Sequence, residues 1–231
     1  VITEVVPYVQ SHATVVGNFI RLPLPEDVID CIATAIKNSG TKAIDEMRVN
    51  TSAEEKRALC EFLGRSDDHA LQPDHVRILS ALPMFETIAY GQELTKDFVS
   101  VQEVNLGAPK SLPVMRINTK LLDLNKDTVR SLALKLKVKI LSQAELLTNV
   151  VFHELTTNLE PERLEQTMDF VMDNLYRLQQ EKPDFVDHLQ KLPFLATPDG
   201  KHVTVTELFD PEVELLKDLF YAEDKFPVGK F

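Results

Sequence analysis

Few residues of this sequence stand at the spacings that catalysis or metal binding requires. His153 and Glu154 match the first half of the zinc-protease helix motif, in which a second histidine follows one helical turn later. Position 157 is a threonine, so the second imidazole ligand is absent. We therefore interpret His153 as a residue on a helix surface, and His188 and His202 as single histidines without a partner at motif spacing.

The densest group of ionisable side chains surrounds a short polar segment. It consists of Asp67, Asp68, His69, Asp74 and His75. This spacing fits no defined metal site, and Asp74 is expected to cap the helix that follows. We interpret the group as a solvated loop. It is also the first place to look for a site completed by sequence outside this chain.

The sequence lacks the loops that hold phosphate groups or catalytic nucleophiles. It contains no Gly-x-Ser-x-Gly turn and no Gly-x-Gly pair among its 7 glycines. No carboxylate stands alone in an apolar setting that would raise its pKa. We predict no catalytic, cofactor-binding or metal-binding residues, no cofactor and no enzymatic activity. The alternative hypothesis is a nucleotide- or metal-dependent enzyme domain that is completed by sequence outside this chain.

Charge and composition limit the possible partners. The 231 residues include 25 basic and 36 acidic side chains, which gives a net charge of −11. Such a chain repels polyphosphates and anionic lipids, so we expect no nucleic-acid partner and no membrane insertion. Two cysteines in a chain of this length favour a reducing, cytoplasmic compartment. Because Val1 is not an initiator methionine, we expect residues 1–231 to be one repeat segment excised from a longer protein.

The strongest pattern in the sequence is a repeat at a spacing of 110 residues. The stretch PDHVRILSALPMFET begins at Pro73, and PDFVDHLQKLPFLAT begins at Pro183. A glycine turn and a strand-like stretch follow each copy, VSVQEV after the first and VTVTEL after the second. Repeated supersecondary units are typical of modular arrays, so we expect two quasi-repeated helix–Pro–hairpin–helix units. A tentative division places them in residues 1–110 and 111–231.

Start and stop signals predict an α+β protein that is mostly helical with short β-hairpins. Pro25 and Gly40 bound the first helix, and capping boxes begin further helices at Ser52 and Ser142. Pro83 ends a helix because it lacks an amide donor and clashes with the preceding turn. The predicted helices are 25–38, 53–64, 74–82, 127–136, 142–151, 161–178, 184–192 and 210–220, and the predicted strands are 84–88, 98–101, 134–140, 194–197 and 202–205.

Two of these elements have both a structural and a functional interpretation. The stretch from Leu134 to Ile140 alternates apolar residues with Lys135, Lys137 and Lys139, which predicts a strand with one wet face. The lysines could accept an acidic partner, but they would also keep an edge strand soluble, and we favour the second interpretation. The Leu-Pro hairpins could add an extended peptide at their edges, but their shared apolar pairs favour a packing role.

Several blocks of the sequence resemble the large repeats of the sacsin family. They are LSALPMFETIAYG, FVSVQE, LKVKILSQAELL and LQKLPFLATPDGKHVTVTELFDPEVELLKDLF with the trailing AEDKFP. The blocks cover Leu79 to Phe231, which is most of the chain. The chain shows no Glu/Asn or Asp-x-Gly-x-Gly signature of a nucleotide pocket, so the resemblance places no ATP-site residue on it.

The resemblance implies a segment of a very large cytoplasmic protein. In that family, three long repeat regions each open with a domain similar to ninety-kilodalton heat-shock chaperones, and a J-domain lies near the end. The family is taken to act as a co-chaperone, and it is linked to intermediate-filament organisation, mitochondrial health and an inherited spastic ataxia. This chain would be a non-catalytic module after a nucleotide-binding domain, and its partners would be other domains of the same protein, heat-shock chaperones and cytoskeletal clients.

Overall fold

Helices and short strands alternate along the chain. The structure, a computed structural model, describes residues 24–65, 71–88, 97–110, 116–210, 212–213 and 226–227. The helices are α3 (Pro25–Ser39), α4 (Thr41–Asn50), α5 (Ala53–Gly64), α6 (Pro73–Ala81), α7 (Asp127–Lys135), α8 (Gln143–Leu146), the π-helical turn η1 (Leu147–Val151), α9 (Phe152–Thr157), α10 (Pro161–Glu181), α11 (Phe185–Leu189) and the 3-10 turn η2 (Val205–Glu207). The strands are β1 (Phe85–Ile88), β2 (Phe98–Val99), β3 (Leu106–Gly107), β4 (Leu121–Leu122), β5 (Lys139–Ile140), β6 (Leu195–Ala196) and β7 (His202–Val203). The chain is α+β and mostly helical with short hairpins, as the sequence predicts.

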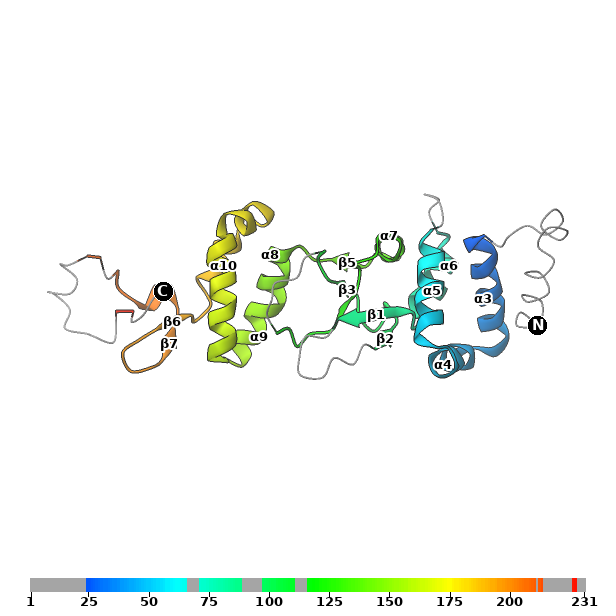
Figure 1. Cartoon of the computed structure of the whole chain (residues 1–231), viewed down its shortest axis with the longest axis horizontal. Coiled ribbons are helices and arrows are strands. Elements are labelled where there is room, and N and C mark those ends of the chain that lie inside the picture. Colours follow the sequence, from blue (N-terminus) through cyan, green and yellow to red (C-terminus); the bar gives the residue numbers. More distant parts are fainter. Residues whose placement is uncertain are drawn as a thin grey trace.

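The described elements follow one another along one long axis (Figure 1). Helices α3 to α6 lie at one end of this axis, and a small sheet lies in the middle with α7 beside it. Helices α8 to α10 follow the sheet, and the β6–β7 hairpin lies beyond α10. The sheet therefore separates two helical layers.

Five short strands form the central sheet in the order β2-β1-β4-β3-β5. Strand β1 is antiparallel to both β2 and β4, whereas β3 is parallel to β4 and β5. Leu121 and Leu122 of β4 are both buried, but successive residues of a strand point to opposite faces. Leu122 belongs to a core formed with α3, α5, α6 and α7, and Leu121 belongs to a second core formed with α8 to α11. The sheet thus contributes to two separate apolar cores.

The first helices begin where the sequence places their caps. Pro25 stands in the first turn of α3, and Gly40 with φ of 60° follows its end, in a left-handed conformation that suits glycine. At α5, Ser52 Oγ accepts the backbone N–H of Glu55 at 3.2 Å, and the Glu55 carboxylate accepts the Ser52 N–H at 2.8 Å. This is the predicted capping box.

The predicted cap of α6 is wrong. The N-cap residue is Gln72, and Asp74 lies one residue inside the helix, in its first turn. Pro73 explains the shift, because its fixed φ suits the first helical position and starts the helix one residue earlier. In the second unit Asp184 does stand at the N-cap of α11, but its carboxylate binds Lys182 at 2.7 Å and caps no backbone amide.

The predicted strand 134–140 is also wrong over most of its length. Helix α7 continues to Lys135, and only Lys139 and Ile140 are in a strand. Between them Lys137 has φ of 62°, its N–H bonds Leu134 O at 2.9 Å, and the Val138 N–H bonds Ala133 O at 2.9 Å. This pair of bonds is a Schellman motif, which ends a helix and here replaces the expected strand. The predicted burial holds only from Leu136 to Lys139, because Leu136 and Val138 are buried and Lys137 and Lys139 are exposed, whereas Leu134 is 58% exposed.

The two predicted hairpins form with the same register. Phe85 pairs with Val99 and Glu86 with Phe98 in the first, and Leu195 pairs with Val203 and Ala196 with His202 in the second. The shared threonines also match: Thr87 N donates to Asp97 O and Thr197 N donates to Lys201 O, both at 2.9 Å. The duplication seen in the sequence is therefore a duplication of structure.

The exits of the hairpins match as well. The Glu103 carboxylate accepts the Ser100 N–H at 2.8 Å, and the Glu207 carboxylate accepts the Thr204 N–H at 2.9 Å. Both pairs were expected from the S/T-x-x-E spacing. The residues at the tip of the first hairpin and most of the predicted helix 210–220 lie outside the described residues. The division into 1–110 and 111–231 stays a prediction.

Candidate functional site

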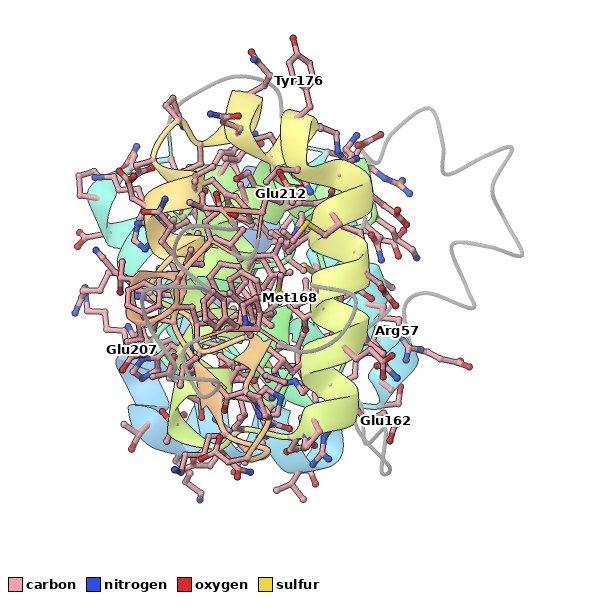
Figure 2. The ribbon with its side chains drawn as sticks, turned by 90° about the vertical axis from the view of Figure 1, so that its left-hand side faces the viewer. Arg57, Glu162, Met168, Tyr176, Glu207 and Glu212 are labelled. Carbon is pink, nitrogen blue, oxygen red and sulfur yellow. The ribbon has the colours of Figure 1, made fainter. Side chains whose placement is uncertain are left out.

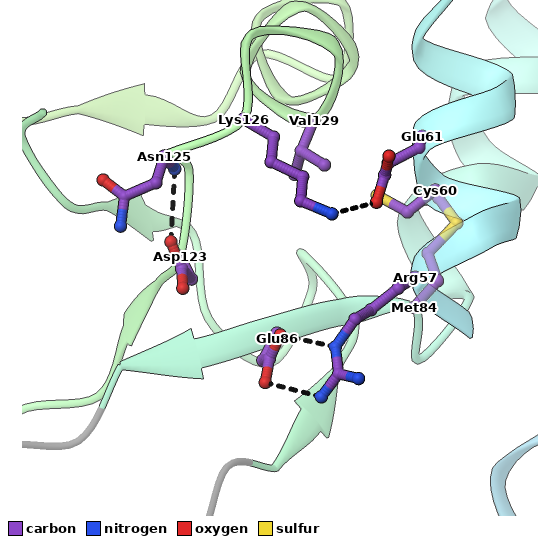
Figure 3. A pocket seen from close by; sticks show the side chains of 9 residues that line it. All are labelled: Arg57, Cys60, Glu61, Met84, Glu86, Asp123, Asn125, Lys126 and Val129. Atoms are coloured by element: carbon purple, nitrogen blue, oxygen red, sulfur yellow. Dashed lines mark hydrogen bonds and ion pairs between the residues drawn. The ribbon is translucent and has the colours of Figure 1, made fainter. Parts of the chain in front are cut away.

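A cavity of about 280 Å³ lies where α5 faces β1, β4 and the segment that leads into α7 (Figure 3). Its lining combines charged side chains with a few apolar ones. The lining residues are Arg57, Cys60, Glu61, Met84, Glu86, Asp123, Asn125, Lys126 and Val129. This pocket brings together residues from three segments that are far apart in the sequence.

The cations of this pocket are paired with carboxylates. Arg57 Nε donates to Glu86 Oε2 at 3.0 Å and Nη2 donates to Oε1 at 3.1 Å, so the pair is bidentate. Figure 3 shows the Arg57 guanidinium facing Glu86 and the Lys126 ammonium facing Glu61. The hydrogen bond with Glu86 raises the pKa of Arg57. The Arg57–Glu86 pair joins α5 to β1, and the Lys126–Glu61 pair joins α5 to the start of α7. Both pairs therefore have a structural role.

The thiol of the pocket is inert. Cys60 is 2% exposed, and burial raises the pKa of its thiol to about 12, with a smaller contribution from the Glu61 carboxylate. A thiol nucleophile reacts as the thiolate, so Cys60 is protonated at neutral pH. The pocket can therefore hold a small polar molecule between paired charges, but Cys60 supplies no activated nucleophile.

Glu154 forms the most connected polar site of the described residues. Its carboxylate accepts the Asn118 N–H at 3.2 Å, the Thr119 N–H at 2.8 Å and the Thr119 hydroxyl at 2.5 Å, and it pairs with Arg163. Burial raises the pKa of Glu154, but the hydrogen bonds from Thr119, Arg163 and the two backbone amides outweigh burial and lower it overall. The carboxylate is therefore held in its charged form and fastens the segment before β4 to α9 and α10.

The sequence could not reveal this site, because the partners of Glu154 are distant in the chain. Thr119 lies 35 residues away, and the match to a zinc-protease motif draws attention to His153 instead. His153 is exposed on α9, as interpreted from the sequence. Arg163 is only 4% exposed, so its charge depends on Glu154 for compensation.

The structure brings together two histidines that the sequence separates. His153 of α9 and His188 of α11 both line a cavity of about 170 Å³, together with Thr148, Phe152, Thr156, Lys191 and Leu192. His188 Nε2 also lies 3.3 Å from Asp184 Oδ2. No group of three or more histidine, cysteine, aspartate or glutamate side chains within the described ranges is arranged to hold a metal ion. His202 stands in β7, apart from this cavity.

The acidic group around residue 70 is described only in part. Asp67, Asp68 and His69 lie outside the described residues. Asp74 is exposed and lies 3.7 Å from Arg77, and His75 Nε2 lies 3.2 Å from Asp30 Oδ1 on α3. The described members of the group therefore contact basic or acidic neighbours within the helical layer.

The lysines near β5 and the residues shared by the two hairpins each have a structural role to compare with the sequence interpretation. Lys139 Nζ pairs with Glu145 at 3.1 Å, so this lysine is engaged within the chain. The shared leucines and threonines of the two hairpin units are buried: Leu79, Leu82 and Thr87 in the first, and Leu189, Leu192 and Thr197 in the second. This burial agrees with the packing interpretation of the repeat.

The chain thus has an α+β fold that contains two helix–hairpin units with matching register. No protein-family profile matches the chain, and no solved structure matches it. Among curated proteins, the chain is similar to sacsin from Homo sapiens, with 28% identity over 181 residues. The match confirms the resemblance to sacsin that the sequence indicates. It covers 76% of this chain but 4% of human sacsin, so the chain spans only a small part of that protein.

Every helix in the described part of the chain is too short or too polar to span a bilayer.

Proposed function

We propose that this chain is a non-catalytic module of a very large, sacsin-like scaffold, in which it positions neighbouring domains and binds segments of partner or client proteins. The observation that carries the proposal is the duplication of the helix–Pro–hairpin unit with one register in both copies. Repeated units that contact mainly their neighbours are typical of extended scaffolds and binding arrays. A single deep catalytic cleft is not required for such a role.

The arrangement of the two cores supports the positioning half of the proposal. Each core lies on its own side of β4, so the two helical layers are held apart by the sheet. Two contacts limit bending between the layers and the sheet. Gly64 of α5 packs against the Thr128 backbone of α7, and Glu154 of α9 holds Asn118 and Thr119. A module of this kind holds the domains on either side of it at a fixed distance.

Exposed apolar groups support the binding half of the proposal. Met172 and Tyr176 stand one turn apart on α10 and are 42% and 78% exposed. Figure 2 shows Tyr176 projecting from the end of α10. Met168 of the same helix is buried. Together these two side chains offer an unfolded segment an exposed apolar contact surface on α10.

The resemblance to sacsin supports a role beside chaperones. If the chain acts as sacsin-family repeats are taken to act, it works in the cytoplasm with heat-shock chaperones and cytoskeletal clients, including intermediate filaments. Mitochondrial health and the inherited ataxia would then follow from the whole protein rather than from this module. The alternative, a nucleotide- or metal-dependent domain completed elsewhere, gains no support from the paired charges and the protonated thiol of the α5 pocket.

Aggregation suppression and solution scattering test the two halves separately. The 231-residue chain should slow the aggregation of a thermally unfolded enzyme in a dose-dependent way, and a Met172→Ser/Tyr176→Ser variant should be weaker. The variant Glu162→Gln, on the same helix but polar, is the matched control. X-ray scattering should give an elongated particle. An unchanged aggregation rate at every ratio contradicts client binding, and a compact profile contradicts the positioning role. Calorimetry with ATP, magnesium and zinc should give no heat of binding.

A further inference from the structure

The cavity of about 170 Å³ between α9 and α11, here called the α9–α11 cavity, differs in charge from the α5 pocket. Its ionisable lining groups are His153, His188 and Lys191, and no carboxylate belongs to the part of its lining that the structure describes. Three carboxylates line the α5 pocket, and two of them pair with its cations. In a chain with a net charge of −11, the α9–α11 cavity is thus a local concentration of basic groups.

The π-helical turn η1 shapes one wall of this cavity. At its end the Phe152 N–H bonds Leu147 O, five residues earlier, whereas an α-helix bonds residues four apart. Residues five positions apart therefore come onto one face here, and both Thr148 and His153 line the cavity. Single π-turns within helices are frequent at functional sites.

Helix α11 and the turn after it supply the opposite wall. Lys191 stands in this turn, where its backbone N–H bonds His188 O at 3.2 Å. Phe152 and Leu192 line the cavity from the core side and are 5% and 1% exposed. The rings of Phe152 and Phe185 lie 5.7 Å apart, so α9 and α11 are packed together below the basic groups.

The donors that a ligand can use belong to the basic side chains. The hydroxyls of Thr148 and Thr156 donate to Ala144 O at 3.0 Å and to Phe152 O at 2.7 Å. Within the described ranges, the side chains of His153 and Lys191 have no hydrogen bond or ion pair. An ammonium group has three N–H donors, and an imidazole has at least one.

The carboxylate in contact with His188 is already compensated. Asp184 Oδ2 lies 3.3 Å from His188 Nε2, and Lys182 Nζ binds the two Asp184 oxygens at 2.7 and 2.8 Å. The hydrogen bond from Lys182 lowers the pKa of Asp184. Asp184 therefore orients the His188 ring through one nitrogen while Lys182 balances its charge.

These donors suit a phosphate group. A phosphate monoester has three strong acceptor oxygens and a charge of about −1.5 to −2 at neutral pH, whereas a carboxylate has two oxygens and a single charge. Sites that enclose a whole small molecule measure roughly 300–1,000 Å³, so the α9–α11 cavity has room for one functional group. His153 and Lys191 are exposed, so such a group can enter from the solvent.

We infer that the α9–α11 cavity binds the phosphate group of a phosphorylated serine or threonine in a partner protein. This inference rests on the proposed function and names the chemistry of the partner segment. Charge-assisted hydrogen bonds from basic side chains to phosphate are strong enough to dock a segment of another protein. The net charge of −11 disfavours long polyanions, so the site selects a single phosphate on an otherwise uncharged segment.

A set of short peptides is the probe. The labelled peptide Gly-Ser-Gly-phosphothreonine-Gly-Ser-Gly should bind the 231-residue chain saturably in fluorescence anisotropy at neutral pH. The same peptide with threonine or glutamate in place of phosphothreonine should bind at least about tenfold more weakly, the loss expected from one charge-assisted hydrogen bond. In NMR spectra, the phosphopeptide should shift the imidazole C–H signals of His153 and His188, while the signal of His202 in β7 stays in place.

Protein variants place the phosphate in the cavity. Lys191→Met and His153→Gln each remove one donor and should weaken phosphopeptide binding at least about tenfold. Lys37→Met is the matched control, because Lys37 is exposed on α3 and its removal changes the net charge equally. That control should change the affinity by less than about threefold, since salt screens a distant charge. Circular dichroism checks that each variant is folded.

The remaining outcomes overturn the inference or separate it from the proposed function. Absence of saturable binding up to about 1 mM, equal binding of the three peptides, or unchanged affinity in Lys191→Met overturns it. If inorganic phosphate shifts the two imidazole signals but the phosphopeptide does not, the cavity holds a free anion and the inference is also overturned. Aggregation suppression by wild type without phosphopeptide binding leaves the proposed function standing while the phosphate site fails, so the two failures are distinguishable.

Discussion

The contact between α5 and α7 makes Gly64→Ala the most direct test of the first core. A methyl group at Gly64 would lie 2.1 Å from the Thr128 carbonyl oxygen and 2.6 Å from its carbon. Both are backbone atoms, so no side-chain rotation relieves the clash, and α7 must move by about 1 Å to restore ordinary contact. Helix α7 carries Leu132 and Ala133, which are both 0% exposed, so this movement disturbs the core.

The expected loss is about 2 kcal/mol in the free energy of unfolding. Overpacking a close contact costs about 1–3 kcal/mol or more, and the better helix propensity of alanine offsets up to about 1 kcal/mol of it. Urea unfolding followed by circular dichroism measures the change as a lower midpoint at constant slope. Gly40→Ala is the matched control, because a methyl group there meets nothing within 4 Å. Its φ of 60° with ψ of −143° is a backbone conformation almost confined to glycine, so strain alone should cost about 1–3 kcal/mol there. If Gly64→Ala leaves the urea midpoint unchanged, the close packing of α5 on α7 is refuted.

Other predictions concern the Schellman motif, Glu154 and the two thiols. Lys137→Gly should raise the free energy of unfolding by about 0.5–1 kcal/mol in urea, because glycine adopts φ of 62° without strain; no gain would contradict the motif. Glu154→Gln should lower the free energy of unfolding by about 3 kcal/mol, because buried Arg163 loses its carboxylate partner. An unchanged urea midpoint would contradict the site. The pKa of Glu154 is lowered in the folded chain, so its contribution to stability is complete above the ordinary pKa of 4.5 and declines as the pH falls through the folded pKa. The free energies of unfolding of wild type and variant should therefore converge in acid, and a constant difference would refute this. A thiol reagent should modify exposed Cys31 in the folded chain and buried Cys60 only on unfolding, and equal rates would contradict the burial.

Local signals predicted most of the fold because they act over a few residues. Proline positions, capping boxes and the alternation of buried residues fix where helices stop and hairpins begin. The same logic succeeds in both copies of the repeat: Pro83 and Pro193 each follow a short helix, and the threonine four residues later bonds across the hairpin. Where the prediction was wrong at α6, the competing signal was also local, since Pro73 starts the helix before Asp74 can cap it.

The remaining features depend on contacts that no local pattern reveals. The sequence from Leu134 to Ile140 alternates as a strand would, but a helix end with one left-handed residue at Lys137 gives the same alternation of buried and exposed positions from Leu136 to Lys139, and it leaves Leu134 exposed. Glu154 is a structural centre only because the segment before β4 lies against it. The Arg57–Glu86 pair spans 29 residues and needs the packing of α5 on β1 to bring its members together.

The two copies of the hairpin motif differ in whether a further strand pairs with them. Both hairpins have the same register, the same threonine bond and the same capped exit, so the motif itself does not decide whether its outer edge is filled. In the first unit Glu86 reaches Arg57 and a strand joins β1, whereas in the second Ala196 has no charged group and Pro198 lacks a donor. Pro198 stands in a tight turn that the hydrogen bond from Gly200 N to Thr197 O closes, so β6 ends at Ala196. Strand β1 continues through Thr87 and Ile88, the two residues with which β4 pairs, and the second hairpin has no strand residues in their place. The length of the hairpin, rather than the shared motif, therefore separates the two copies.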